Sequence, residues 1–272
     1  MKVNLLFSID DYFVDQMKTT LFSIRENISE ATFCTVYVLQ KELLSDDLHA
    51  FCRYLNMQYV PLVIGEDDLF EHAPVSSRYP ETIYYRLMAH KYLPKTVGKV
   101  LYLDADILCI NDLLPFYQMD ISDYLYAAAS HKQLTQVTKR INQVRLKNYE
   151  AAGYYNSGVL LMNVTRIRQE VHAEDIFAFI RSNQFNLLLP DQDILNALYG
   201  EKILAVPDQI YNYDVRKNPT YETISMGEWD LNWVMQHSVF LHFCGKEKPW
   251  ELKYRGRYAA LYKHYWYQVR RK

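Results

Sequence analysis

The sequence predicts an α/β protein whose mixed, mostly parallel sheet is flanked by helices. Two observations lead to this fold class. Over the first hundred residues, short apolar runs rich in β-branched and aromatic side chains alternate with segments whose apolar residues recur at helical spacing. With 272 residues, of which 50% are hydrophobic, the chain can also bury one full core.

The first half of the chain supplies strands and helices in alternation. Residues 3–9 form an apolar run that is too short to span a membrane and ends in the polar Asp10 and Asp11, so we expect a buried first strand there. The elements expected in this half are strands over 3–9, 35–39 and 59–64 and helices over 13–28, 44–55 and 82–93, the last of them stopped by Pro94.

The second half begins with a strand over 99–103 that leads directly into Asp104 and Asp106. Ligands bind at the carboxyl ends of strands in open α/β sheets, so the two acids stand where a site is expected. The other elements expected here are strands over 124–129, 158–162 and 239–243, a polar helical segment over 132–149, a helix over 194–199, and loops at 217–220 and 225–227.

Composition and charge argue against several classes of protein. The formal net charge of −2 does not suit a general nucleic-acid binder. No G-x-G-x-x-G turn follows the first strand, which argues against a dinucleotide-binding domain for nicotinamide or flavin cofactors. The four cysteines lack C-x-x-C spacing and are expected to be reduced thiols. Because no leader and no long apolar stretch is apparent, we expect a cytoplasmic protein.

The end of the chain differs from the rest, and we expect residues 1–250 to form one domain and residues 251–272 a basic, aromatic C-terminal helix. From Lys246 onward, nine basic residues face two glutamates. Such a helix can lie on anionic lipid at the inner face of the cell membrane or pack on its own domain, and both readings stay open. The apolar stripe of this helix consists of Tyr258, Leu261, Tyr262, Tyr265, Trp266 and Val269.

Asp104 and Asp106 are the first candidates for metal binding. In an extended backbone, residues i and i+2 point to the same side, so the two carboxylates can converge on one hard divalent cation if the strand continues through them. Taken alone, such a pair is about equally typical of a solvated loop. The metal hypothesis therefore depends on further polar segments, which occur at 155–163, 191–196 and 242–250.

Residues 99–106, 155–163, 191–196 and 242–250 resemble, in sequence and in order, the motifs of family 8 glycosyltransferases. This family contains bacterial lipopolysaccharide galactosyl- and glucosyltransferases and, more distantly, glycogenin. The resemblance extends over residues 3–250 and implies a GT-A fold, with residues 1–250 as the catalytic domain. It also implies a Mn²⁺-dependent hexosyltransferase, with Mg²⁺ as the alternative ion, that uses UDP-galactose or UDP-glucose with retention of anomeric configuration. The acceptor would be a saccharide on a glycan, glycolipid or glycoprotein, and a cell-envelope glycan if the tail binds a membrane.

The resemblance assigns the metal to Asp104, Asp106 and His242. An imidazole among carboxylate and phosphate ligands suits Mn²⁺ better than Mg²⁺. Gly245 would let the backbone approach the diphosphate, and Lys248 would supply a positive charge to it. Without the resemblance, His242 would be read as a structural histidine and Lys248 as an ordinary surface lysine.

The nucleotide is assigned mainly to the end of the first strand. Asp10 matches the acid that faces the uracil ring in the family, but the family's Asp-x-Asn-Tyr is replaced here by Asp10-Asp11-Tyr12-Phe13, so the ribose contact expected from Asn is lost or replaced. Phe13 would stack on the base or, alternatively, lie on the buried face of the first helix. The nucleotide-binding residues implied are Ser8, Asp10, Tyr12, Phe13, Asp104, Ala105, Gly245 and Lys248.

The donor sugar is assigned to an arginine and to two polar segments. Arg86 would bridge sugar hydroxyls and a metal-bound aspartate, whereas a helical arginine is otherwise most often a solvated ion pair. Asp191 could instead cap the helix that follows it. The donor-sugar residues implied are Arg86, Asn156, Ser157, Asp191 and Gln192.

Gln192 and Asp193 are the catalytic candidates. Gln192 sits where the family places an amide near the anomeric carbon, and as a poor nucleophile it suits stabilisation of an oxocarbenium-like state. Asp193 is the nearby carboxylate that could attack directly, or it could cap the same helix. Retention permits a covalent intermediate or same-face attack guided by the departing phosphate. The residues do not choose between them, and analogy with the family favours same-face attack.

Two other classes of protein fit part of the pattern. A haloacid-dehalogenase-type phosphatase also has a strand that ends in Asp-x-Asp, but near its N-terminus and followed by Thr or Val where this chain has Ile107. A non-catalytic glycan-binding protein could retain the fold, but the presence of both acids and His242 argues against a loss of the catalytic residues. The acceptor side is predicted at 78–80 and 211–233, where aromatic residues suit stacking on sugars.

Overall fold

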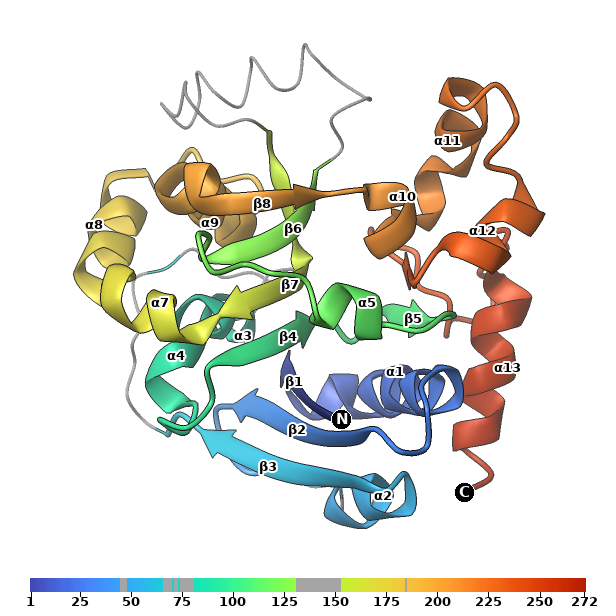
Figure 1. Ribbon diagram of the computed structural model, residues 1–272, viewed down its shortest axis with the longest axis horizontal. Coiled ribbons are helices and arrows are strands. Elements are labelled where there is room, and N and C mark those ends of the chain that lie inside the picture. The colour runs from blue at the N-terminus through green and yellow to red at the C-terminus, as the bar shows by residue number, and fades with distance from the viewer. Residues whose placement is uncertain (45–47, 66–69, 71–72, 74–80, 131–152, 184) are drawn as a thin grey trace.

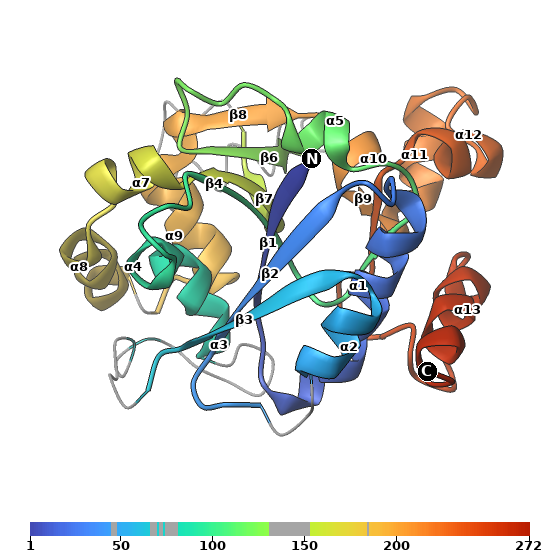
Figure 2. The same cartoon turned by 60° about the horizontal axis from the view of Figure 1, so that its bottom comes forward.

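The computed structural model describes residues 1–44, 48–65, 70, 73, 81–130, 153–183 and 185–272 (Figure 1). The polar helical segment predicted over 132–149 and the acceptor-side residues predicted at 78–80 lie outside the described residues. Helices cover both faces of a central sheet, so the predicted α/β class is confirmed (Figures 1 and 2).

A seven-stranded sheet forms the centre of the described chain. Its strands are β1 (Lys2–Ser8), β2 (Phe33–Gln40), β3 (Met57–Val63), β4 (Lys99–Leu103), β6 (Tyr126–Ser130), β7 (Tyr155–Asn163) and β8 (Ile203–Val206). Their order is β3-β2-β1-β4-β7-β6-β8. β7 runs antiparallel to both of its neighbours, and the other pairings are parallel. The mixed, mostly parallel sheet predicted from the sequence is therefore confirmed.

The reversed direction of β7 brings its first residues to the carboxyl end of β4. Leu103, the last residue of β4, pairs with Val159 in the antiparallel register. Just beyond that pair, the Asp104 N–H donates a hydrogen bond to the Gly158 carbonyl oxygen at 2.8 Å. β1 is the neighbour of β4 on the other side. The edge at which ligands of α/β sheets bind is thus shared by three strands.

The helices divide between the two faces of this sheet because successive strand side chains point to opposite sides. Leu5 and Phe7 of β1 belong to the core formed with α1, α2 and α5, whereas Leu6 belongs to the core formed with α3, α4, α7, α8 and α9. These helices are α1 (Val14–Asn27), α2 (Leu48–Tyr54), α3 (Thr82–Tyr85), α4 (Ala89–Tyr92), α5 (Leu114–Tyr117), α7 (Val164–Glu170), α8 (Ala173–Asn183) and α9 (Pro190–Tyr199).

The segment predicted as one helix over 82–93 is helical but divided. α3 is followed by a 3₁₀ turn at Arg86–Met88 and then by α4. The chain leaves the helix at Leu93, which is extended, as expected for a residue before proline. The 3₁₀ turn begins with Arg86, whose side chain is buried.

A three-stranded sheet made of β5 (Ile107–Cys109), β10 (Phe240–His242) and β9 (Tyr213–Asp214) completes the site edge. β10, predicted over 239–243, runs antiparallel to β5 and parallel to β9. His242 pairs with Ile107, the first residue after the acidic turn. This pairing places the imidazole beside the two aspartates. Helices α10 (Asp208–Tyr211), α11 (Asn218–Ile224) and α12 (Leu231–His237) lie around this sheet.

The C-terminal helix α13 (Ala259–Val269) lies beside α1 in both views (Figures 1 and 2). Tyr262 and Val269 of its apolar stripe are buried. Tyr265 OH accepts a hydrogen bond from Asn27 Nδ2 of α1 at 3.2 Å. The stripe therefore contacts the rest of the chain. Within the described ranges, no helix has the length and apolar character needed to cross a membrane.

Candidate active site

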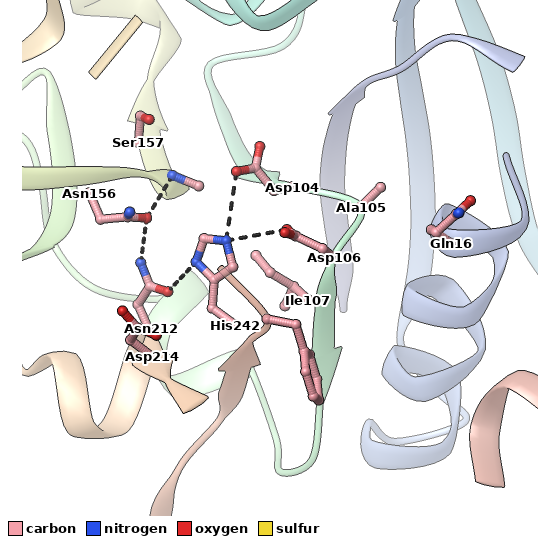
Figure 3. Close-up of polar contacts among 12 residues, drawn as sticks. Gln16, Asp104, Ala105, Asp106, Ile107, Asn156, Ser157, Asn212, Asp214 and His242 are labelled. Carbon is pink, nitrogen blue, oxygen red and sulfur yellow. Dashed lines mark hydrogen bonds and ion pairs between the residues drawn. The ribbon is translucent and has the colours of Figure 1, made fainter. Parts of the chain in front are cut away.

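The two aspartates predicted to bind a metal lie in the turn between β4 and β5 and not in a continuous strand. Their side chains converge nevertheless. One ligand atom from each of Asp104, Asp106 and His242 lies within 4.8 Å of the other two. His242 Nε2 is 3.2 Å from Asp106 Oδ1 and 3.9 Å from Asp104 Oδ2 (Figure 3). The predicted convergence is confirmed, although a turn supplies the geometry that was expected from an extended strand.

The donor set and the space around it fit a divalent cation. Two carboxylates and an imidazole suit Mn²⁺, whereas Mg²⁺ prefers oxygen ligands alone. Gly158 leaves room for this arrangement, because a Cβ at that position would lie 2.4 Å from His242 Cε1 and 2.6 Å from Asp104 Oδ2. The residues present therefore match a metal site of the predicted composition.

Positive charge surrounds Asp106, whose side chain is 13% exposed. Lys248 Nζ lies 2.5 Å from Asp106 Oδ2 and donates to the Phe243 carbonyl oxygen at 3.0 Å. Burial favours the neutral carboxyl, but Lys248 and His242 outweigh burial and hold the pKa of Asp106 well below its usual range. Burial lowers the pKa of Lys248, yet Asp106 raises it above the ordinary value. Asp106 is therefore ionised at neutral pH, as a metal ligand must be.

Arg86 joins the acidic pair to the predicted sugar residues. Its guanidinium is 6% exposed, and Nη1 lies 2.9 Å from Asp104 Oδ1 and 3.4 Å from Asp191 Oδ2. The same nitrogen donates to the Ser157 carbonyl oxygen at 3.0 Å, and the Tyr102 ring lies 4.5 Å from the guanidinium carbon. Burial opposes the charge, but Asp104, Tyr102 and Asp191 raise the pKa of Arg86 above its usual value. Arg86 is thus a buried bridge and not a solvated surface ion pair.

The other predicted sugar residues lie beside this bridge. Ser157 Oγ donates to Asp191 Oδ2 at 2.8 Å. Asn156 Nδ2 and the Ser157 N–H both donate to Gln192 Oε1, at 3.1 and 3.3 Å. Burial raises the pKa of Asp191 above its usual value, although Arg86 opposes that shift. The structure brings all the predicted donor-sugar residues to one place, while their contact with a sugar stays a prediction.

Asp193, the second catalytic candidate, is fully buried at the start of α9. Its Oδ1 accepts from Tyr154 OH at 2.5 Å. Its Oδ2 accepts from the backbone N–H groups of Leu188 and Leu189 at 2.7 and 3.1 Å. These bonds hold the two residues that lead into α9, a structural role related to, but different from, the helix cap weighed for this residue. A nucleophilic role for Asp193 stays a prediction, and it would require these bonds to be given up.

The predicted nucleotide residues lie at the carboxyl end of β1. Asp10 Oδ1 accepts the Tyr12 N–H at 3.1 Å and starts a short 3₁₀ helix, Asp11–Phe13. Phe13 is partly buried against the core and meets the Trp250 ring edge-on, with centroids 6.3 Å apart. The side chain of Tyr12 is 69% exposed. Phe13 therefore packs on the core and also lies next to the predicted nucleotide residues. Tyr12 is the more solvent-exposed of the two aromatic rings.

The remaining predicted nucleotide residues surround the same edge. Ser8 Oγ donates to the Thr82 carbonyl oxygen at 2.6 Å, and Ala105 is buried inside the acidic turn. Gly245 has a φ of +99°, a left-handed conformation that favours glycine. A Cβ at Gly245 would lie 2.9 Å from Arg216 Nη1. The left-handed backbone is the main reason for glycine at this position, because the end of the flexible Arg216 side chain could move away from a Cβ.

Asn212 is a site residue that sequence reasoning missed. Its Oδ1 lies 2.8 Å from Nδ1 of His242, and its Nδ2 donates to Asn156 Oδ1 at 2.8 Å (Figure 3). It stands between two tyrosines at the end of α10, in no recognisable spacing pattern. The pairing of β9 with β10 brings it to the site. No signal in the sequence marks that pairing.

Comparisons with known proteins complete the description of the site. Residues 4–253 match the family model described as Glycosyl transferase family 8. General stress protein A of Bacillus subtilis (strain 168) is 24% identical over 270 residues, which cover 97% of this chain and 92% of that protein. Lipopolysaccharide glucosyltransferase WaaO of Escherichia coli (strain K12) is 28% identical over 217 residues, 77% of this chain and 61% of that protein. The crystal structure of galactosyltransferase LgtC with donor and acceptor sugar analogs has a TM-score of 0.78 at 19% identity, and the match covers 98% of this chain and 96% of that one.

Proposed function

The chain belongs to glycosyl transferase family 8, and we propose that it transfers a hexose, galactose or glucose, from a UDP-sugar to a saccharide acceptor. It has the GT-A fold, as its likeness to LgtC shows. One observation carries the proposal: Asp104 belongs both to the cluster with Asp106 and His242 and to the Arg86 bridge that reaches Asp191. A cation and a sugar would therefore meet at one carboxylate.

We propose Mn²⁺ as the ion held by Asp104, Asp106 and His242, with Mg²⁺ as the alternative. When bound, the cation stabilises the negative charge that develops on the diphosphate as the bond to the sugar breaks. The imidazole favours Mn²⁺ over Mg²⁺. Gly158 supports this site, because the absence of a side chain there leaves room for His242 and Asp104 to approach each other.

The diphosphate would lie on the side of Lys248 and Gly245. Lys248 Nζ is 2.5 Å from Asp106 Oδ2, so anionic oxygens bound at the cluster come within its reach. The backbone at Gly245 carries no side chain that would hinder close approach. UDP is the proposed nucleotide because Asp10 follows β1, the strand that pairs with β4, and matches the acid that the family places against uracil.

Retention of configuration is proposed through same-face attack. The acceptor hydroxyl would bond to the anomeric carbon on the face from which the diphosphate departs, and its proton would pass to the departing phosphate oxygen. Gln192 would stabilise the oxocarbenium-like state, with Arg86, Asn156, Ser157 and Asp191 holding the sugar. The hydrogen bonds of Asp193 support this route over a covalent one, because they occupy both of its oxygens.

We propose a cell-envelope glycan as the acceptor class. Support comes from a relative whose name is lipopolysaccharide glucosyltransferase, matched over 77% of this chain. Residues 211–233 would form part of the acceptor side. Galactose and glucose remain the two candidate donors, since they differ only at C4, and no residue described above distinguishes the two configurations.

The proposed place of action is the cytoplasmic side of the membrane, with residues 1–250 as the catalytic domain and 251–272 as a peripheral contact. Because Tyr262 is buried against the protein, lipid would meet the exposed basic residues that follow the helix, Arg270 to Lys272. Reversing these three charges to glutamate should release the protein from sedimenting anionic vesicles at low salt. Undiminished binding would overturn this proposal.

The function is tested by release of nucleoside diphosphate from a panel of UDP-, GDP- and ADP-sugars without acceptor, since such transferases can slowly hydrolyse their donor. Reactions are run with Mn²⁺, with Mg²⁺ and with EDTA. Asp104→Asn is the test variant. Asp120→Asn is the matched control, because Asp120 is an exposed residue whose carboxylate bonds to the nearby Ser122.

Release from one UDP-hexose, abolished by EDTA and by Asp104→Asn but kept in Asp120→Asn, is the expected result and names the donor. Absence of release from every donor, with no thermal stabilisation by UDP and Mn²⁺ together, would support the non-catalytic glycan-binding alternative. The haloacid-dehalogenase-type phosphatase reading is not supported by the family membership. Phosphate release from simple phosphomonoesters would support the phosphatase reading.

A further inference from the structure

We propose that Asn212 is a positioning residue that fixes the tautomer of His242 and links the metal centre to Gln192. This role rests on the proposed function, because it presumes a cation at Asp104, Asp106 and His242. Asn212 itself touches none of the reacting groups. It acts through a chain of hydrogen bonds that runs from His242 through Asn212 to Asn156 (Figure 3) and from Asn156 to Gln192.

One backbone N–H determines the direction of these bonds. The Gly158 N–H can only donate, and it lies 2.9 Å from Asn156 Oδ1, so that atom is an acceptor. The Asn212 atom 2.8 Å from the same oxygen must then belong to the NH₂ group. The amide oxygen of Asn212 is left to face His242 Nδ1 at 2.8 Å. Since an amide oxygen only accepts, Nδ1 must carry a proton.

A proton at Nδ1 prepares His242 as a ligand. With Nδ1 bonded to Asn212, Nε2 is the nitrogen that faces Asp106 at 3.2 Å and Asp104 at 3.9 Å, and it would bind the cation after giving up the proton that these carboxylates attract. The opposite tautomer would turn an N–H toward the cation and could not bind it. His242 and Asn212 are 3% and 2% exposed, so water does not compete for this bond. Asn212 thus selects the metal-binding form of the ring.

The other end of the chain of bonds reaches the predicted catalytic amide. Asn156 Nδ2 donates to Gln192 Oε1 at 3.1 Å, and the Ser157 N–H donates to the same oxygen at 3.3 Å. The oxygen of Gln192 is therefore held from the protein side, which leaves its NH₂ group as the end that can turn to a substrate. Two asparagine amides, 212 and 156, connect this residue to the metal ligand.

Two substitutions at Asn212 separate the two roles. Asn212→Leu removes both bonds at nearly constant volume. Asn212→Asp keeps an oxygen acceptor for Nδ1 but removes the NH₂ donor and turns a carboxylate oxygen toward Asn156. Asn27→Leu is the control, because it makes the same change at a partly buried amide that bonds to Ser23, Cys109 and Tyr265 away from the cluster.

Mn²⁺ affinity is measured first, by the EPR signal of free Mn²⁺ in titrations without nucleotide. Asn212→Leu should weaken binding by about 10- to 100-fold, the usual effect of losing the partner of a metal-bound histidine. Asn212→Asp should bind at least as tightly as the wild type and yet hydrolyse the UDP-hexose donor more slowly, because Gln192 is no longer linked to the cluster. Asn27→Leu should match the wild type in affinity. Equal Mn²⁺ affinity in Asn212→Leu and the wild type would overturn the positioning role.

The ring proton is observed directly in protein labelled with ¹⁵N-histidine. The His242 signal, assigned by its loss in His242→Asn, should show an Nδ1–H that is protected from exchange in the wild type and in Asn212→Asp but not in Asn212→Leu. An unprotonated Nδ1 in the wild type would refute the tautomer assignment. This measurement needs no metal. If the wild type binds no Mn²⁺, the proposed metal site fails while the role of Asn212 is still tested.

Discussion

Substituting Gly158 by alanine tests the packing that keeps the metal cluster together. The described glycines with positive φ are at other positions, so the backbone at 158 accepts a side chain without strain. The new Cβ would lie 2.4 Å from His242 Cε1 and 2.6 Å from Asp104 Oδ2. Since carbon atoms in contact are about 3.5 Å apart, His242 or strand β7 must move by about 1 Å.

The size of the effect follows from that displacement. A shift of about 1 Å in a catalytic constellation costs about 100-fold in rate. Overpacking of this kind lowers stability by about 1–3 kcal/mol. A glycine-to-alanine change without a steric clash would instead raise stability by about 0.4–1 kcal/mol, because it restricts the unfolded chain. We expect Gly158→Ala to unfold at a lower temperature, to bind Mn²⁺ more weakly, and to hydrolyse the donor about 100-fold more slowly.

Gly98→Ala serves as the control for Gly158→Ala. Gly98 precedes β4, and a Cβ there would meet Thr165 Oγ1 at 3.1 Å, a contact that a small side-chain movement relieves. Mn²⁺ titration by EPR, donor hydrolysis and thermal unfolding are measured on both variants. Wild-type affinity and turnover in Gly158→Ala would refute the reasoning. Losses of equal size in Gly98→Ala would show that the effect is not specific to the cluster.

Three further predictions concern the bridge, a buried histidine and the C-terminal helix. Arg86→Lys keeps the charge but cannot span Asp104, Asp191 and the Ser157 carbonyl oxygen together, so donor hydrolysis should fall by about 100-fold. Unchanged turnover would show that the bridge is not used. Burial, aided by the charges of Lys91 and Arg168, lowers the pKa of His90 from 6.5 to about 4. The unfolded chain then takes up a proton near pH 6.5 and the folded chain only near pH 4, so stability is complete above 6.5 and decreases by up to about 3 kcal/mol as the pH falls to 4. His90→Gln should flatten that slope in urea titrations between pH 4 and 7, and an unaltered slope would contradict the assignment. Ending the chain after Arg257 removes the buried Tyr262 and Val269, each worth about 2 kcal/mol, so the truncated protein should melt well below the wild type. A truncated protein of wild-type stability that has lost only its binding to anionic vesicles would instead assign the helix to the membrane.

The strands and the acidic pair could be predicted because their signals are local. An apolar run such as 99–103 is buried wherever it lies in the sheet, and its acids follow at once. The direction of β7 could not be read, because a strand buried on both faces carries no mark of its orientation. That direction decides that Asn156 and Ser157, rather than the far end of the strand, stand beside Asp104.

Site residues that belong to a sequence motif could be predicted. Residues that join the site only through contacts between distant parts of the folded chain could not. His242 and Lys248 follow one another in a recognisable segment. Asn212 acquires its role from a hydrogen bond to a residue 30 positions later, which no periodicity records. Asp193 could not be resolved from the sequence because an acid in the first turn of a helix suits both capping and catalysis. In the structure Asp193 holds the backbone N–H groups of Leu188 and Leu189, just before the helix, and its catalytic role stays a prediction.

The pairing of residue 107 with residue 242 joins β5 to β10, the last strand of the described residues. A protein leaves the ribosome amino end first. The acidic turn therefore emerges long before the histidine and lysine that complete its surroundings. A nascent chain offers only the two carboxylates until the strand that holds His242 has also been made. The proposed three-residue metal site could therefore form only after residue 242 has been added, and a chain that stops before it would lack the imidazole.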